Sequence, residues 1–151
     1  METNPMFQIG KIDQVGVAVR NADEAAKFMQ AAFGLTFTTF NMPEARAILH
    51  GREVRFITRI SIARAGAIDL EMMQILEGDH IVKEFMESHG PGIHHLGIYV
   101  KDLNRSVKEW EEKGGTLLQR TAHPAGIGTA YLQIEGLWGG SCIELIKLGG
   151  G

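Results

Sequence analysis

An α+β fold made of two similar modules is predicted for this chain of 151 residues. The main observation is an internal repeat, in which "IDQVGVAVRNADEAAKFMQAAFGL" (12–35) aligns with "IHHLGIYVKDLNRSVKEWEEKGGT" (93–116). The closing segments also align, since "IDLEMMQIL" (68–76) matches "SCIELIKLG" (141–149). Because a repeat decides the architecture, each half is expected to contain a strand, a helix and further strands, the last of which carries a glutamate.

In the first half, alternation and capping residues define the elements. Residues 11–19 alternate with a period of two, which is typical of a half-buried strand. The next helix is expected to begin at Asn21 or Asp23, which are good N-cap residues, and to end before Gly34. A strand, a turn and a second strand are expected at residues 53–63, 65–67 and 68–76.

A helix over residues 79–89, with Asp79 as its N-cap, is expected to join the two halves. In the second half, a helix is expected to begin at Asp102 or Asn104 and to stop at the glycine pair 114–115. A single domain over residues 8–151 is therefore expected, made of modules 8–78 and 92–149 with helix 79–89 between them.

The composition excludes several classes of protein. The formal net charge is -3 at pH 7, whereas nucleic acids and anionic membranes bind basic faces. The single cysteine, Cys142, excludes an intrachain disulfide framework and is typical of a reducing compartment. The sequence has neither a signal peptide nor a run of about 20 apolar residues, so a cytoplasmic protein is expected.

Four polar residues at matched positions of the repeat point to a metal site. Gln14 aligns with His95 and Glu71 with Glu144, and each lies in an otherwise apolar strand. Taken singly, such a histidine is usually a core residue and such a glutamate an edge residue, but the matched pairs favour a site. One imidazole nitrogen, two carboxylates and an amide oxygen suit divalent Co, Ni, Zn, Mn, Mg or Fe rather than a structural zinc site of the thiolate type.

The neighbours of these residues carry further expectations. Gly16 and Gly97 are expected to leave room over the metal for a substrate. Strand alternation predicts that His94 points to the face opposite His95, where it packs behind that residue or supports it as a neighbour of the ligand. No role is assigned to His50, His80 and His89. His123 has no assigned role either, although it lies on a glycine-rich loop where it could contact a substrate.

The strand at residues 53–63 has two distinct faces. One face carries four apolar residues expected to pack on a helix, namely Val54, Phe56, Ile60 and Ile62. The other carries Arg55, Arg59 and Ser61, and if it lines the cleft its guanidinium groups would bind an anionic substrate. The alternative is that this second face is simply exposed to solvent.

The chain resembles the vicinal oxygen chelate (glyoxalase/bleomycin resistance/dioxygenase) superfamily, and within it most of all the methylmalonyl-CoA epimerases. The matching motifs are "KIDQVGVAV" (11–19), "IVKEFMESHGPGIHHLGIYVKDL" (81–103) and "CIELIK" (142–147), so the resemblance extends over nearly the whole chain. The middle motif is the most discriminating, because glyoxalase I sequences usually lack it.

This resemblance implies a glyoxalase-like fold, in which paired βαβββ modules form a metal-containing cleft. It also implies four metal ligands, which carry over to Gln14, Glu71, His95 and Glu144. The chain departs from the epimerases in two ways. They usually have His at the position of Gln14, and they place an acid/base carboxylate near the position of Arg59. The set Gln, Glu, His, Glu is similar to that of some glyoxalase I enzymes.

The expected function is a metal-dependent isomerase or epimerase of this type, in which the metal stabilises an enolate while Glu144 and Glu71 act as catalytic acid and base. The expected partner is an anionic small molecule such as an acyl-CoA, bound by a homodimer. Three alternatives stay open: a lactoylglutathione lyase like glyoxalase I, an iron dioxygenase, and a non-catalytic binding protein. Dioxygenases normally present two histidines and one carboxylate, and binding members generally lack the full ligand set.

Overall fold

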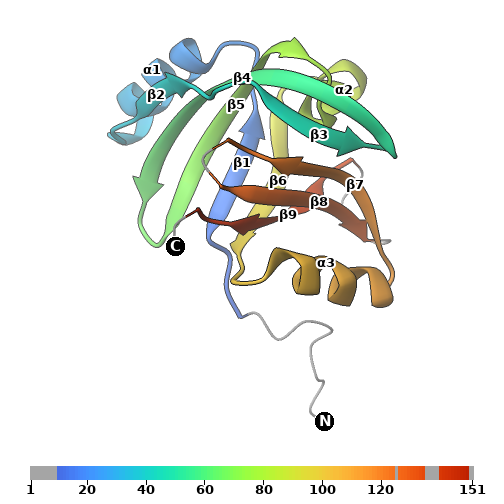
Figure 1. Cartoon of the computed structure of the whole chain (residues 1–151). Helices are drawn as coiled ribbons and strands as arrows, with labels where there is room; N and C mark the ends of the chain where they lie inside the picture. Colours follow the sequence, from blue (N-terminus) through green and yellow to red (C-terminus); the bar gives the residue numbers. More distant parts are fainter. Residues whose placement is uncertain (1–9, 125, 135–139, 150–151) are drawn as a thin grey trace.

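The structure, a computed structural model, describes residues 10–124, 126–134 and 140–149 and has a mixed sheet curved into a barrel with three helices (Figure 1). The strands are β1 (Gln14–Ala18), β2 (Thr38–Asn41), β3 (Ala45–Leu49), β4 (Arg52–Ala65), β5 (Ile68–Gly78), β6 (Gly92–Tyr99), β7 (Gly115–Ala122), β8 (Gly128–Ile134) and β9 (Cys142–Lys147). The helices are α1 (Ala22–Phe33), α2 (Ile81–His89) and α3 (Leu103–Glu112). The predicted α+β glyoxalase-like fold is confirmed.

The strand order shows how the two halves join. The strands lie in the order β2-β4-β3-β7-β8-β9-β6-β1-β5, and an additional β4–β5 pairing closes the sheet. The first strands of the two halves, β1 and β6, pair antiparallel at one seam, and β3 pairs with β7 at the other. Each half also pairs its first strand with its last in parallel, β1 with β5 and β6 with β9. The repeat in the sequence therefore corresponds to a repeat in the strand pairing.

The helix ends follow from their capping residues. Asn21 caps α1 by accepting a hydrogen bond from the backbone N–H of Glu24 (3.0 Å), and Gly34 ends it in the left-handed region at φ 70°. Asp102 caps α3 through the N–H of Arg105 (3.0 Å). Both N-caps are among those that the sequence predicts.

The cap of α2 differs from its prediction. His80, and not Asp79, is the N-cap, and its Nδ1 accepts from the N–H of Val82 at 3.0 Å. The backbone of His80 is still extended, so helical geometry begins only at Ile81. The Asp79 carboxylate instead accepts from exposed Arg52 at 3.3 Å.

Two groups of buried apolar side chains stabilise the barrel. One lies inside the sheet and under α2, and includes Phe56, Phe85 and Tyr131. The other lies between α3 and its strands, where Val107 and Trp110 point inward as predicted. Each fully buried side chain of this size contributes about 1.5–3 kcal/mol. No helix in the described ranges is both long and apolar enough to cross a membrane.

Candidate metal centre

The seam between β1 and β6 brings the four predicted metal ligands together. In the first half, β1 pairs with β5 so that Gly16 lies opposite Glu71. In the second half, β6 pairs with β9 so that Gly97 lies opposite Glu144 in the equivalent register. Across the seam, Gly16 lies opposite His95 and Gly97 opposite Gln14. The alignment of the repeat thus corresponds to an approximate twofold arrangement of side chains.

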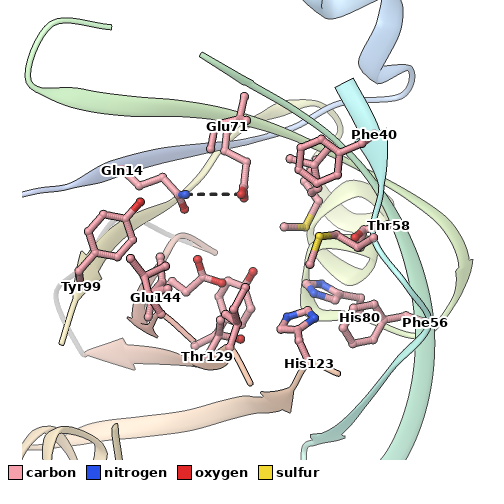
Figure 2. Close-up of a pocket in the computed structure, with 18 residues that line it drawn as sticks. Gln14, Phe40, Phe56, Thr58, Glu71, His80, Tyr99, His123, Thr129 and Glu144 are labelled. Carbon is pink, nitrogen blue, oxygen red and sulfur yellow. Dashed lines mark hydrogen bonds between the residues drawn. The ribbon is translucent and has the colours of Figure 1, made fainter. Parts of the chain in front are cut away.

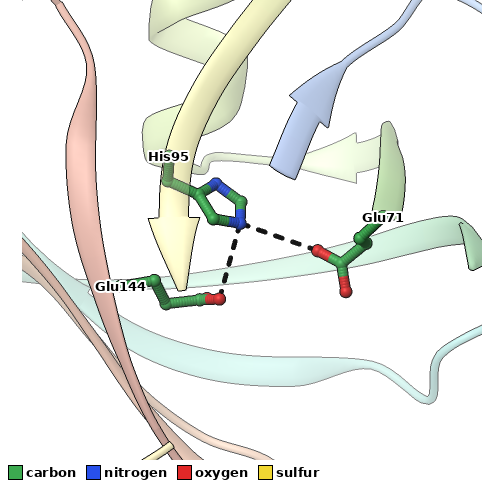
Figure 3. Close-up of side chains that lie close together, drawn as sticks. All are labelled: Glu71, His95 and Glu144. Atoms are coloured by element: carbon green, nitrogen blue, oxygen red, sulfur yellow. Dashed lines mark ion pairs between the residues drawn. The ribbon is translucent and has the colours of Figure 1, made fainter. Parts of the chain in front are cut away.

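Glu71, His95 and Glu144 converge on one point, as Figure 3 shows. The Nε2 atom of His95 lies 3.8 Å from Oε1 of Glu71 and 3.5 Å from Oε1 of Glu144. One ligand atom from each of the three residues lies within 4.8 Å of the others. The amide of Gln14 joins the group, since its Nε2 donates to Oε2 of Glu71 at 3.4 Å.

The hydrogen bonding of these residues fits a cation. Gln14 Oε1, Glu71 Oε1 and His95 Nε2 are buried side-chain atoms that have no hydrogen-bond partner in the described part of the chain. Buried polar atoms in proteins are nearly always hydrogen-bonded, so three such atoms from one cluster call for an explanation. A divalent ion would satisfy all three, because each presents a lone pair of the kind that such ions bind.

Burial controls the charges of the cluster. It lowers the pKa of His95 well below the usual range, so the imidazole is neutral and keeps a lone pair for a metal. Burial, with a smaller effect from Asp69, raises the pKa of Glu71 to about 7. Burial and the charge of Glu71 raise the pKa of Glu144 to about 8, although a hydrogen bond with Tyr131 lowers it. Without a cation, the two carboxylates therefore tend to hold a proton near neutral pH.

The two glycines serve the ligands and not a substrate, so the prediction that they leave room for a substrate was wrong. A Cβ atom on Gly16 would lie 2.0 Å from His95 Nε2, and one on Gly97 would lie 2.9 Å from Gln14 Cβ. Each glycine accommodates the ligand that projects from the strand across the seam. The sequence spacing identified the two glycines correctly, but the space that they leave is taken by the side chains of His95 and Gln14 and not by a substrate.

The expectation that His94 packs behind His95 or supports it agrees with its buried position and its contact with the His95 ring, but the strand alternation behind that expectation is interrupted by a β-bulge in β6. Gly16 pairs with His95 and Val17 pairs with Ile93, so His94 is an extra residue and both imidazoles are buried. Their Nδ1 atoms lie 3.0 Å apart, and His94 Nε2 lies 3.7 Å from Sγ of Cys142. If His95 binds a metal through Nε2, its Nδ1–H donates to His94, which fixes the orientation of the ligand ring.

A cavity of about 210 Å³ opens beside this cluster (Figure 2). Gln14, Glu71 and Glu144 form part of its wall, together with Tyr99 and Tyr131. Most of the remaining wall is apolar, including Phe40, Met42, Phe56, Ile60, Met73 and Ile146. Sequence reasoning missed this apolar wall, although the run of apolar residues at alternate positions of β4 was its signal.

The charged face of β4 does not line the cavity, so the expectation that Arg55, Arg59 and Ser61 bind an anionic substrate there was wrong. Its apolar residues point into the barrel, where Phe56, Ile60 and Ile62 line the cavity, and Phe56 and Ile60 belong to the buried cluster that includes residues of α2. The face with Arg55, Arg59 and Ser61 is turned away from the cavity. Arg59 makes two hydrogen bonds with Asp23 at 2.8 and 2.9 Å, and Ser61 donates to the carbonyl of Ala22 at 3.0 Å. These residues hold α1 against the sheet and are absent from the cavity wall.

His80 and His123, to which the sequence gave little weight, both line the cavity. His50 and His89, the other two histidines without a predicted role, are exposed. His50 Nε2 forms a hydrogen bond with the Glu84 carboxylate at 2.7 Å, and His89 stacks on Phe85.

Comparison with known proteins finds methylmalonyl-CoA epimerases both among relatives in sequence and among similar solved structures. A mitochondrial methylmalonyl-CoA epimerase from Bos taurus is 24% identical over 145 residues, which cover 87% of this chain and 77% of that protein. Among solved structures, a methylmalonyl-CoA epimerase from Mycobacterium tuberculosis has a TM-score of 0.66 at 21% identity, covering 99% of this chain and 94% of that one. A hypothetical protein from Bacillus halodurans C-125 has a TM-score of 0.69 at 20% identity, covering 93% and 96%.

The similar solved structures are only 20% and 21% identical in sequence, so they show the fold alone. The family is shown by a family model that matches the sequence. The model of the Glyoxalase/Bleomycin resistance protein/Dioxygenase superfamily matches residues 13–131, which include three of the four cluster residues, Gln14, Glu71 and His95. Members of this superfamily typically use a divalent metal. The chain therefore belongs to the Glyoxalase/Bleomycin resistance protein/Dioxygenase superfamily.

Proposed function

We propose that the protein is a metal-dependent isomerase of the methylmalonyl-CoA epimerase type, which moves a proton on the carbon next to a substrate carbonyl. The observation that carries this proposal is a pair of carboxylates, the partly buried Glu71 and the buried Glu144, at equivalent positions on either side of the neutral imidazole of His95. The similarity to epimerases from cattle and Mycobacterium tuberculosis supports it.

The proposed metal ligands are Gln14, Glu71, His95 and Glu144. A divalent ion bound there would act as a Lewis acid that polarises the substrate carbonyl and stabilises the enolate formed when the α-proton leaves. The amide and the imidazole contribute no charge, so the two carboxylates balance the charge of the ion.

Glu71 and Glu144 also have the properties of an acid/base pair. In the metal-free protein burial raises their pKa values to about 7 and about 8, so each site can hold a proton near neutral pH. A bound cation would favour the ionised form, and a loosely ligating carboxylate would then act as the base that takes the α-proton. Because they come from opposite halves of the barrel, one carboxylate takes the α-proton and the other returns a proton to the opposite face. Tyr131 positions Glu144 through their hydrogen bond.

Beside Glu144 on β9, we assign the second acid/base role to Glu71 on β5 and not to a residue of β4. Arg59, near the position where epimerases are expected to have a carboxylate, points away from the cavity and pairs with Asp23. Among the described residues of the cavity wall, Glu71 and Glu144 are the carboxylates. The apolar remainder of the wall excludes water from the enolate, and the acyl part of an acyl-CoA is the group that we assign to it.

The test is exchange of the α-proton of methylmalonyl-CoA with deuterium from D₂O, followed by mass spectrometry on protein loaded with Co²⁺, Ni²⁺, Zn²⁺ or Mn²⁺. We expect exchange in the wild type and a decrease of about 100-fold or more in Glu144→Gln and in Glu71→Gln. Glu77→Gln, an exposed position on the same strand as Glu71, is the matched control and should exchange normally. Equal rates in all four proteins would exclude these carboxylates as the acid and base.

A lyase of the glyoxalase I type is the second candidate, because Gln14 supplies an amide where epimerases usually have an imidazole. Its substrate would be the hemithioacetal of methylglyoxal and glutathione, and the same carboxylates would move a proton between its adjacent carbons. Thioester formation from this adduct, without exchange on methylmalonyl-CoA, would favour the lyase over the epimerase.

A further inference from the structure

The cavity has a second polar wall, away from the metal centre. Figure 2 shows the imidazole rings of His80 and His123 side by side on the side opposite Gln14 and Tyr99. Both rings lie edge-on to Phe56, with centroid distances of 4.6 Å for His80 and 6.2 Å for His123. The two histidines come from different elements, one from the start of α2 and the other from the loop after β7.

The fold determines which ring nitrogen of His80 carries the proton. Its Nδ1 accepts from the N–H of Val82 in the helix cap, so the proton of the neutral ring is on Nε2. The ring is almost completely buried, with an exposed fraction of 2%, and it lies edge-on to Tyr131 as well as to Phe56. His80 therefore offers a fixed N–H donor that the helix cap does not use.

His123 is the second polar residue of this wall. Its Nδ1 is buried and has no hydrogen-bond partner in the ranges that the structure describes. Its backbone is held in place, because its N–H donates to the carbonyl of Ile127 (2.9 Å) and its own carbonyl accepts from Gly126 (3.1 Å). A buried nitrogen without a partner is costly, so a ligand group that pairs with it would stabilise the complex.

The absence of positive charge on the described part of this wall indicates which chemical groups it can bind. Burial lowers the pKa of His80 to about 3 and also lowers the pKa of His123, so both rings are neutral at pH 7. No lysine or arginine lies among the described residues of the cavity wall. A carboxylate or phosphate would find no countercharge here, whereas a hydroxyl or carbonyl group could pair with neutral imidazoles.

We propose that His80 and His123 form a subsite that binds a neutral hydrogen-bonding group, a hydroxyl or carbonyl, at the end of the substrate remote from the metal centre. The substrate class is then an acyl compound with a chelating oxygen pair at one end, an apolar middle against Phe56 and Ile60, and a neutral polar group at the other end. This inference rests on the proposed function for the position of the chelating end.

The test uses hydroxamic acids, which chelate metals through two oxygens, on protein loaded with Ni²⁺. Two series with chains of four to eight carbons are compared by isothermal titration calorimetry, one ending in a methyl group and the other in a terminal hydroxyl. For at least one chain length, we expect the hydroxyl compound to bind about 3- to 10-fold more tightly than its methyl counterpart, as one net hydrogen bond provides.

Two variants assign that preference to the histidines. His80→Asn retains a side chain that caps helices well but lacks the Nε2–H donor, and His123→Leu removes the unpaired nitrogen. Each should lose most of the preference for the hydroxyl series while binding the methyl series within about 3-fold of the wild type. His89→Asn, at the exposed end of α2, is the control and should keep the preference.

The outcomes separate this proposal from the proposed function. A preference that is lost in both variants supports the subsite even if α-proton exchange is absent, in which case only the reaction is wrong. The subsite is wrong if no chain length shows a preference, if the preference survives in both variants, or if no hydroxamate binds. Normal α-proton exchange beside any of these three results would leave the proposed function standing without the subsite.

Discussion

Gly16 shows how closely the candidate metal centre depends on single atoms. The missing side chain at this position is what admits the His95 ring, since an added Cβ would lie 2.0 Å from Nε2. The sequence predicted Gly16 and His95 as parts of one site because both lie on matched strands of the repeat. It could not predict that they lie opposite each other, because the pairing of β1 with β6 depends on a bulge at His94.

Gly16→Ala should therefore reduce metal affinity by about 10- to 100-fold or more, because the new methyl group displaces the ligating nitrogen. Gly97→Ala is expected to have a smaller effect, since its Cβ would meet Gln14 Cβ at 2.9 Å and Oε1 at 3.1 Å. Competition with a fluorescent chelator measures both affinities, and circular dichroism checks that the variants are folded. Wild-type affinity in folded Gly16→Ala would contradict His95 as a ligand.

The two carboxylates predict a pH dependence for the metal-free protein. The folded-state pKa values of Glu71 and Glu144 lie above the ordinary value of 4.5, so their stabilising contribution is complete below about pH 4.5 and is lost as the pH rises through about 7 to 8. Metal-free Glu71→Gln and Glu144→Gln should thus be more stable than the wild type at about pH 9, by on the order of 3 kcal/mol, and nearly equal to it at about pH 5.

Urea unfolding of the metal-free proteins at both pH values measures this difference. The buried histidines also titrate, but they are present in the wild type and in both variants, so their contribution largely cancels. An advantage of the variants that is the same at both pH values would show that the carboxylates do not change their protonation on folding.

At the scale of elements, all three helices were predicted closely, and only the N-cap of α2 was wrong. Asn21 and Asp102 are ordinary N-caps, whereas the cap of α2 is a histidine beside a more typical capping aspartate. On β4, the sequence left open whether the charged face lines the cavity or lies outside it, and the structure has it outside. Alternation separates two faces but does not tell which one is inside, and the Arg59–Asp23 pair allows the charged face to be covered by α1.

Removal of the cap should weaken α2. His80→Ala is expected to cost about 1 kcal/mol from the lost cap, with an additional cost from the space left between Phe56 and Tyr131. His80→Asn should recover the capping part, because asparagine can accept from the same Val82 N–H. Chemical unfolding measures both, and an identical loss in the two variants would indicate that packing, and not capping, is what His80 contributes to α2.

At the scale of the whole molecule, the cluster joins the two halves of the chain. Gln14 and Glu71 come from the first half, and His95 and Glu144 from the second. The repeat predicted this meeting because it relates β1 to β6 and β5 to β9, and the strand pairing has that symmetry. The homodimer expected from the sequence stays a prediction, which sedimentation analysis would check.

Because a bound ion would link both halves, metal should stabilise the entire barrel. At a free concentration of 100 times Kd, an ion adds about 2.7 kcal/mol, which raises the Tm of a domain of this size by about 5–10 °C. A chelator should reverse the increase, and Glu144→Gln should show little or none. Thermal scans with and without metal measure this, and a Tm that is insensitive to metal in the wild type would argue against the site.

The glycine at each seam position also has a consequence for how the ligand set can change. Gly97 lies opposite Gln14 and leaves room for it, just as Gly16 lies opposite His95 and leaves room for that ring. The barrel therefore provides two equivalent places for a ligand side chain, and only one of them holds an imidazole. The other could exchange its amide for a second imidazole without altering the strand pairing. Metal preference in this scaffold is therefore adjustable from one half alone, while the opposite half keeps its geometry.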